Sequence, residues 1–188
     1  FRRHGYLGKE LFPTLSKYVG EADILITEGT MHGRKHENIV PENEIQQRII
    51  TILKEHKYVF ALCSSSDIDR LASFHAACKK TGRVFFVDEY QKSILDVFSK
   101  YAGKQSHLFN FDAFKLVNYS TPNVKRKLTR EGFLMPIRIS SYHFVKGMLG
   151  VYNDESAWLI YSMWGGYAEE GKGYSIENVA NIRNLFAP

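Results

Sequence analysis

The chain has 188 residues, of which 44% are hydrophobic and 24% charged, a balance that is typical of folded globular proteins and excludes wholesale disorder. This length fits one domain, or one domain and part of another, with a sizeable core. Lysine and arginine number 25 against 20 acidic residues, so the net charge of +5 favours polyanionic partners. The apolar runs are too short to span a bilayer, and the two cysteines are too few for a disulfide scaffold. We therefore expect a cytoplasmic protein that does not enter a membrane.

The first half of the chain alternates between strand-like and helix-like patterns. Residues 22–27 (ADILIT) form a short apolar run that predicts a strand. Residues 42–57 place three isoleucines and a leucine on one face, which predicts an amphipathic helix. Residues 58–62 (YVFAL) are typical of a buried strand in a parallel sheet.

The same alternation continues after the second strand. Asp67 has the position of an N-cap before a helix that Gly82 ends. Residues 84–87 (VFFV) predict another buried strand, and residues 89–101 another helix. Strands and helices in this order imply a parallel sheet with right-handed crossovers, so we expect a doubly wound α/β fold.

The second half of the chain is less regular. Residues 123–132 predict a short basic helix, and residues 135–139 and 157–163 (AWLIYSM) predict strands. No repeat, low-complexity tract or linker divides the sequence.

Polar clusters follow four of the predicted strands, at residues 28–30, 64–67, 88–89 and 164–167. In open parallel sheets, ligands bind outside the carboxyl ends of the strands, where helix N-termini converge. For each cluster taken alone, caps and turns without any ligand are the favoured explanation. Together, the four clusters predict a binding cleft at this edge of the sheet.

Two groups of residues are candidates for phosphate contacts. Ser64, Ser65 and Ser66 stand at a predicted helix start with Arg70 one turn further on, where hydroxyls and backbone N–H groups could hold a phosphate. Simple helix capping explains the serines equally well. A second group lies in the predicted basic helix and suits a nucleic-acid backbone, although a solvated helix face would look the same; it comprises Lys125, Arg126 and Lys127.

No nucleotide-binding or metal-binding signature accompanies these candidates. Neither GxGxxG nor GxxxxGK[ST] occurs, which argues against a dinucleotide enzyme. His32 and His36 have the spacing of two ligands on a helix, but no third ligand stands at a matching distance. We predict no metal site in this chain.

Several segments resemble one family of nucleases. FRRHGYLG followed by ADILITEGT is similar to the stretch after the fourth metal motif of metallo-β-lactamase-fold nucleases. FALCSSSDIDRL and GRVFFVDEY resemble the paired strand-turn-helix units of the β-CASP domain of those enzymes. WLIYSMWGGY resembles the segment with which the RNA-processing branch, ribonuclease J-like and cleavage and polyadenylation factor-like, leaves that domain.

The resemblance implies a Rossmann-like β-CASP domain over residues 41–168, flanked by pieces of a metallo-β-lactamase fold at 1–40 and 169–188. The parent protein would be a hydrolase, a ribonuclease that cleaves phosphodiester bonds with two zinc ions. The metal motifs would lie before Phe1 and after Pro188, so this chain alone would be inactive and would hold no zinc. Its partners would be RNA, preferably single-stranded, and the rest of the metallo-β-lactamase domain in the same polypeptide.

The resemblance also assigns roles to individual residues. Glu28 would orient a metal-binding histidine from outside the chain without binding zinc itself. Ser64, Ser65, Ser66 and Arg70 would contact RNA phosphates. Ribonuclease J continues with Gly-Arg-Ser after its second strand, whereas this chain has Asp88, Glu89 and Tyr90. That acidic turn implies a different pattern of phosphate contacts, so exonuclease activity does not follow from the resemblance.

A second function stays open from the residues themselves, namely a self-contained α/β module that binds a small phosphorylated or sugar ligand. A scaffold domain without a ligand is the third alternative. The sequence does not separate RNA from DNA, or endonuclease from exonuclease, although the WGGY segment favours RNA. Strand edges left exposed would also allow a homodimer.

Overall fold

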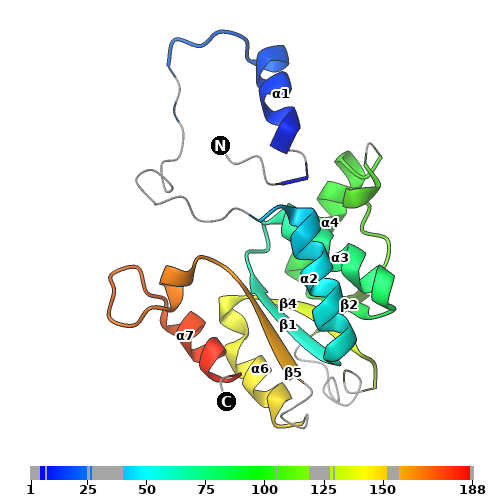
Figure 1. Ribbon diagram of the computed structural model, residues 1–188, viewed down its shortest axis with the longest axis vertical. Helices are drawn as coiled ribbons and strands as arrows, with labels where there is room; N and C mark the ends of the chain where they lie inside the picture. The colour runs from blue at the N-terminus through cyan, green and yellow to red at the C-terminus, as the bar shows by residue number, and fades with distance from the viewer. Residues whose placement is uncertain are drawn as a thin grey trace.

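The computed structural model describes residues 5–6, 8–24, 26, 40–104, 106–118, 128, 130–151 and 157–186. Within them lies a five-stranded, all-parallel sheet with the strand order β3-β2-β4-β1-β5 (Figure 1). The predicted α/β class and parallel sheet are confirmed. The strands are β1 (Tyr58–Cys63), β2 (Val84–Val87), β3 (Lys115–Leu116), β4 (Phe133–Ile137) and β5 (Ala157–Ser162).

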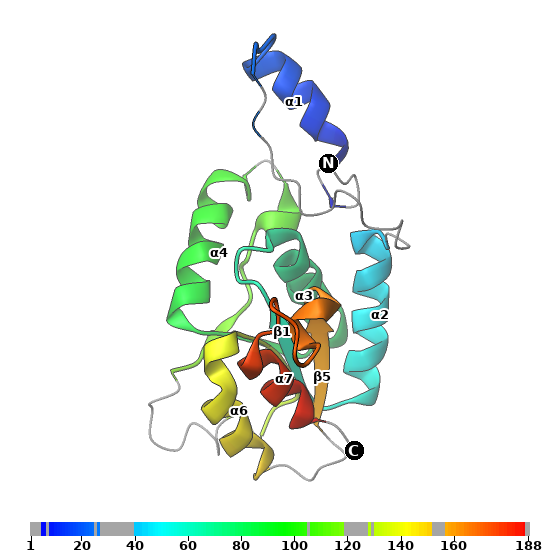
Figure 2. The same ribbon diagram turned by 90° about the vertical axis from the view of Figure 1, so that its left-hand side faces the viewer.

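Helices cover both faces of the sheet, as Figure 2 shows. One face carries α2 (Glu42–Glu55), α3 (Ile68–Thr81) and α4 (Glu89–Tyr101), and the other carries α6 (Tyr142–Leu149) and α7 (Glu177–Asn184). Successive strand side chains point to opposite faces, so β1 supplies both cores. Val59 and Ala61 belong to the first core, whereas Phe60 and Leu62 belong to the second.

Helices α3 and α4 have the predicted ends because their caps are local, whereas α2 ends at Glu55, two residues before the predicted end. The Asp67 carboxylate accepts a hydrogen bond from the Arg70 N–H at 3.3 Å, which begins α3. Gly82 ends that helix with φ of 67°, a left-handed conformation that glycine adopts without strain. Asp88 and Gln91 form a capping box at the start of α4.

Two predicted strands differ from the structure. The strand expected over residues 22–27 is wrong, because the described residues 22–24 and 26 form no strand. Ile24 and Ile26 are 79% and 91% exposed, and an apolar run forms a stable strand only where its backbone groups are paired. The strand expected over residues 135–139 lies two residues earlier, since its pairing with β1 ends at Leu62 and Ile137 and a 3-10 helix follows.

Several short elements have no clear sequence signal. The pattern analysis missed α1 (Leu11–Tyr18), α6, α7 and the two-residue strand β3. No residue of α1 is buried, whereas α7 places Val179 and Ile182 in the core beside α6. Most of the basic helix predicted over residues 123–132 lies outside the described residues. None of the helices in the described part of the chain is long and apolar enough to cross a membrane.

Candidate ligand site at the carboxyl edge of the sheet

A pocket of about 520 Å³ lies at the carboxyl ends of β1, β4 and β5. Its walls are the turn after β1, the segment after β4, Met163 after β5, Tyr90 from α4 and Asn178 from α7. The neighbours β1 and β4 lead into α3 and α6, which lie on opposite faces of the sheet. This is the switch point of a doubly wound sheet, the position at which such folds bind ligands.

The three predicted serines meet in this pocket, in the turn that joins β1 to α3. The hydroxyls of Ser64 and Ser66 lie 2.8 Å apart and share one hydrogen bond, and the Ser66 N–H donates to the Ser64 hydroxyl at 3.3 Å. One hydroxyl of this pair is the donor in the shared bond. The hydroxyl that accepts retains its own proton for a ligand.

Ser65 differs from its neighbours because its hydroxyl is buried and unpaired. The residue is only 7% exposed, and among the described residues its hydroxyl oxygen is the buried side-chain polar atom without a hydrogen-bond partner. Leaving such a group unsatisfied costs on the order of 1–3 kcal/mol. Buried polar groups nearly always have partners, so this hydroxyl marks a place where a ligand or an ordered water supplies one.

The charged side chain of the pocket wall is Arg138, which the sequence analysis missed. It follows β4 directly, and its guanidinium donates to the Asp88 carboxylate through Nε at 3.1 Å and Nη2 at 2.6 Å. The guanidinium carbon also lies 5.1 Å from the centre of the Tyr90 ring. The sequence did contain a signal for it, because Arg138 directly follows a strand, as the four predicted clusters do. It was missed because the strand was predicted to end at residue 139, one residue after Arg138.

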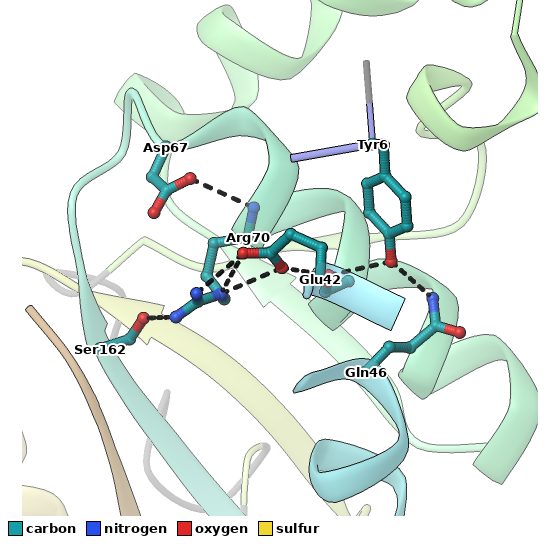
Figure 3. Close-up of polar contacts among 7 residues, drawn as sticks. Tyr6, Glu42, Gln46, Asp67, Arg70 and Ser162 are labelled. Atoms are coloured by element: carbon teal, nitrogen blue, oxygen red, sulfur yellow. Dashed lines mark hydrogen bonds and ion pairs between the residues drawn. The ribbon is translucent and has the colours of Figure 1, made fainter. Parts of the chain in front are cut away.

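Arg70 lies beside the serine turn, but its guanidinium already has protein partners (Figure 3). Nε and Nη2 donate to the Glu42 carboxylate, with an Nη2 to Oε1 distance of 2.8 Å, and Nη1 donates to the Ser162 hydroxyl. Burial by itself lowers the pKa of Arg70, but the hydrogen bonds and charge of Glu42 raise it above its usual value. A phosphate at Arg70 would compete with these partners, so this contact stays a prediction.

The Glu42 carboxylate extends this network toward the N-terminal segment. It accepts a hydrogen bond from the Ser73 hydroxyl at 2.7 Å. The Tyr6 hydroxyl lies 3.1 Å from that of Ser73 and accepts a bond from the Gln46 amide at 3.2 Å. The network thus joins residue 6, α2, α3 and the end of β5 (Figure 3), and it holds the helix that follows the serine turn.

The other predicted clusters lie at the edge of the pocket or outside the described residues. Asp88 caps α4 and pairs with Arg138, while Trp164 packs its ring against Tyr167 and Tyr174. A β-carbon on Gly166 would lie 2.5 Å from the Trp164 ring, so a side chain at that position would displace the ring. Outside the described residues are Glu28, His32, His36, Lys125, Arg126 and Lys127.

Cys63 reaches the pocket from the end of β1, but its thiol is not activated. Burial raises its pKa to about 12, so the reactive thiolate is not populated near neutral pH. Nor do the described residues contain three or more histidine, cysteine or acidic side chains grouped to hold a metal ion. The site as described is therefore suited to binding an anion through hydroxyls and a guanidinium.

Comparison with known proteins adds no relative. No protein-family model, curated protein or solved structure matches this chain. The resemblance to β-CASP nucleases therefore depends on the short segments quoted above. The structure adds a parallel α/β sheet with a pocket at its carboxyl edge that the serine turn and Arg138 line.

Proposed function

We propose that this chain binds the phosphate backbone of single-stranded RNA at the strand-end pocket, as the nucleic-acid-clamping part of a metal-dependent ribonuclease. The unpaired, buried hydroxyl of Ser65 in the pocket wall carries the proposal. A phosphate oxygen accepts hydrogen bonds from hydroxyls and from guanidinium N–H groups. Ser65, the Ser64–Ser66 pair and Arg138 supply both kinds of donor from two neighbouring strands.

The charge of the chain supports a polyanionic ligand. The net charge is +5, and among the described residues that line the pocket Arg138 is the one with a charged side chain. Asp88 offsets part of that charge, but its carboxylate accepts hydrogen bonds from Nε and Nη2, so this ion pair does not use the two N–H groups on Nη1. The pocket therefore has cationic donors for a phosphate.

The nuclease part of the proposal comes from the quoted sequence segments. In that account residues 41–168 are the β-CASP domain, residues 1–40 and 169–188 belong with a metallo-β-lactamase domain in the same polypeptide, and this chain alone is inactive.

Several large apolar side chains near the N-terminus are exposed, which supports an interface with another domain there. They are Leu15, Tyr18, Val19, Ile24 and Ile26. In the same account the two zinc ions belong to the parent enzyme. Buried free thiols at Cys63 and Cys78 suit a cytoplasmic location.

The test is a titration of a fluorescein-labelled ten-nucleotide RNA with the whole chain, followed by fluorescence anisotropy at about 50 and 200 mM salt. The Ser65→Ala variant should bind the RNA roughly 10-fold more weakly, because a hydrogen bond to a charged phosphate is lost. Its thermal midpoint should not fall, since the variant removes a buried group without a partner. RNA binding that is absent, salt-independent or unchanged in Ser65→Ala would overturn the proposal.

A matched control separates binding from folding. Ser73→Ala removes a buried hydroxyl in α3 that donates to Glu42 and lies outside the pocket wall. This variant should lose stability, because the carboxylate loses a donor, and should keep its affinity for RNA. Equal effects of the two substitutions on RNA affinity would mean that the serine turn contributes only to folding.

A second candidate function is binding of a small phosphorylated or sugar ligand. The pocket volume of about 520 Å³ favours it, because small-molecule sites usually have volumes of roughly 300–1,000 Å³. A nucleoside monophosphate or sugar phosphate would then raise the thermal midpoint, whereas the ten-nucleotide RNA would have no effect. A thermal midpoint that rises with the RNA and not with the small ligands would favour the RNA-binding function.

A further inference from the structure

The pocket has an exposed aromatic wall that phosphate binding does not explain. Tyr90 stands in the first turn of α4, lines the pocket and is 56% exposed. Aromatic rings are usually buried, because each carries a large apolar area. An exposed ring beside hydrogen-bond donors for a phosphate is suited to stacking with a flat, hydrophobic group that is attached to that phosphate.

The ring is held in place on one side by a fixed cation. The Arg138 guanidinium carbon lies 5.1 Å from the ring centre, which is within the range of a cation–π contact. Asp88 fixes the guanidinium through two hydrogen bonds, and its carboxylate is itself almost fully buried. A ring held by such a pair loses little conformational freedom when a ligand stacks on it.

We infer that Tyr90 is the platform on which a base of the RNA stacks, while the adjoining phosphate binds the serine turn and Arg138. The inference rests on the proposed function and adds a subsite to it. Stacking on an aromatic ring tolerates every base, because each base has a π-face. The subsite would therefore strengthen binding of RNA of any sequence and would discriminate against a phosphate chain without bases.

The same helix supplies a matched control. Tyr101 ends α4, is 66% exposed and has the Lys100 ammonium 5.0 Å from its ring centre. It thus shares with Tyr90 an exposed ring with a neighbouring cation, but it does not line the pocket. A general effect of exposed tyrosines on RNA binding would appear at both positions.

The experiment compares a ten-nucleotide RNA with an abasic ribose-phosphate oligomer of the same length, for the wild type and for Tyr90→Leu, Tyr90→Phe and Tyr101→Leu. Tyr90→Leu should weaken RNA binding about 10-fold, as expected for the loss of one stacked base. Its affinity for the abasic oligomer should stay unchanged, and Tyr90→Phe and Tyr101→Leu should bind RNA as the wild type does. Thermal midpoints close to that of the wild type would show that Tyr90→Leu is folded.

The outcomes separate the two proposals. RNA and abasic oligomer bound equally by the wild type, with no effect of Tyr90→Leu, would overturn the stacking subsite and leave the phosphate clamp standing. An equal loss of RNA affinity in Tyr101→Leu would also overturn it. No binding of either oligomer would overturn the proposed function itself.

Discussion

Asp88, in the turn after β2, has a role in the structure that the sequence did not predict. In the sequence, Asp88 and Glu89 suggested an acidic turn where ribonuclease J has an arginine. In the structure, Asp88 places one oxygen on the Gln91 N–H and the other on the Arg138 guanidinium. The acid therefore fixes an arginine at the pocket wall. No local pattern could show this, because Arg138 follows β4, which lies far along the chain from Asp88.

His75 is a second residue whose environment only the structure defines. The residue is buried between Phe85 and Phe111, and its Nε2 accepts a hydrogen bond from the Ala113 N–H at 3.3 Å. Burial lowers the pKa of this imidazole, the charge of Asp112 acts to raise it, and Lys79 acts to lower it. The neutral form that accepts from Ala113 is therefore favoured in the folded state.

We predict that this histidine makes stability fall as the solution becomes acidic. The imidazole has a pKa near 6.5 in the unfolded chain, and its pKa in the folded protein is lower. The contribution of His75 to the free energy of unfolding is therefore complete above about pH 6.5. It is lost as pH falls through the pKa of the folded protein. In His75→Gln, the amide oxygen can still accept from Ala113 but does not titrate. Urea unfolding between pH 5 and 8 should show the wild type losing stability relative to this variant on the acidic side. A stability difference that stays constant over this range would contradict the prediction.

At the scale of the elements, the first strand-helix units were predictable and the later ones were not. The patterns at β1, α3, β2 and α4 combine buried runs with local caps, so their ends follow from neighbouring residues. The helices α6 and α7 have eight residues each, which is too short for a clear period. The two-residue strand β3 exists only through its pairing with β2.

The candidate site was predictable in part for the same reason. The serine turn follows a recognisable strand and precedes a capped helix, so its place at the sheet edge could be read from the sequence. The partners of Arg70 could not be predicted from the sequence, because Glu42 lies in another helix and Ser162 lies at the end of another strand. Spacing showed only that Arg70 is one turn from the serines.

We predict that the Arg70–Glu42 pair is a main attachment of α2 to α3. Glu42 is 2% exposed, and removing one partner of a buried ion pair costs about 3–5 kcal/mol, because the other charge is left unpaired. Glu42→Ala should therefore lower the free energy of unfolding by several kcal/mol, as measured by urea denaturation. Glu44→Ala is the control, because Glu44 forms an exposed pair with Arg48 in the same helix and should cost less than about 1 kcal/mol. Similar losses in the two variants would show that the buried pair is not a main attachment.

At the scale of the whole molecule, the strand order creates the site. β1 and β4 are far apart in the chain but adjacent in the sheet, and this adjacency brings the serine turn beside Arg138. The sequence predicted a parallel sheet but not the order β3-β2-β4-β1-β5, because pairing between distant strands leaves no local signal. For that reason the serines could be predicted as site residues, but their position beside Arg138 could not.

The most direct test of the central claim, that RNA binds at the carboxyl edge of the sheet, is a map of amide chemical-shift changes in the 15N-labelled chain. We expect a single-stranded ten-nucleotide RNA to shift the amides of residues 64–70, 90 and 138–141, because these segments form or adjoin the pocket wall. The amides at the opposite, amino ends of β1 and β4 should stay unchanged. Shifts confined to those opposite ends or to α1, or no shifts under conditions in which RNA is bound, would contradict the account.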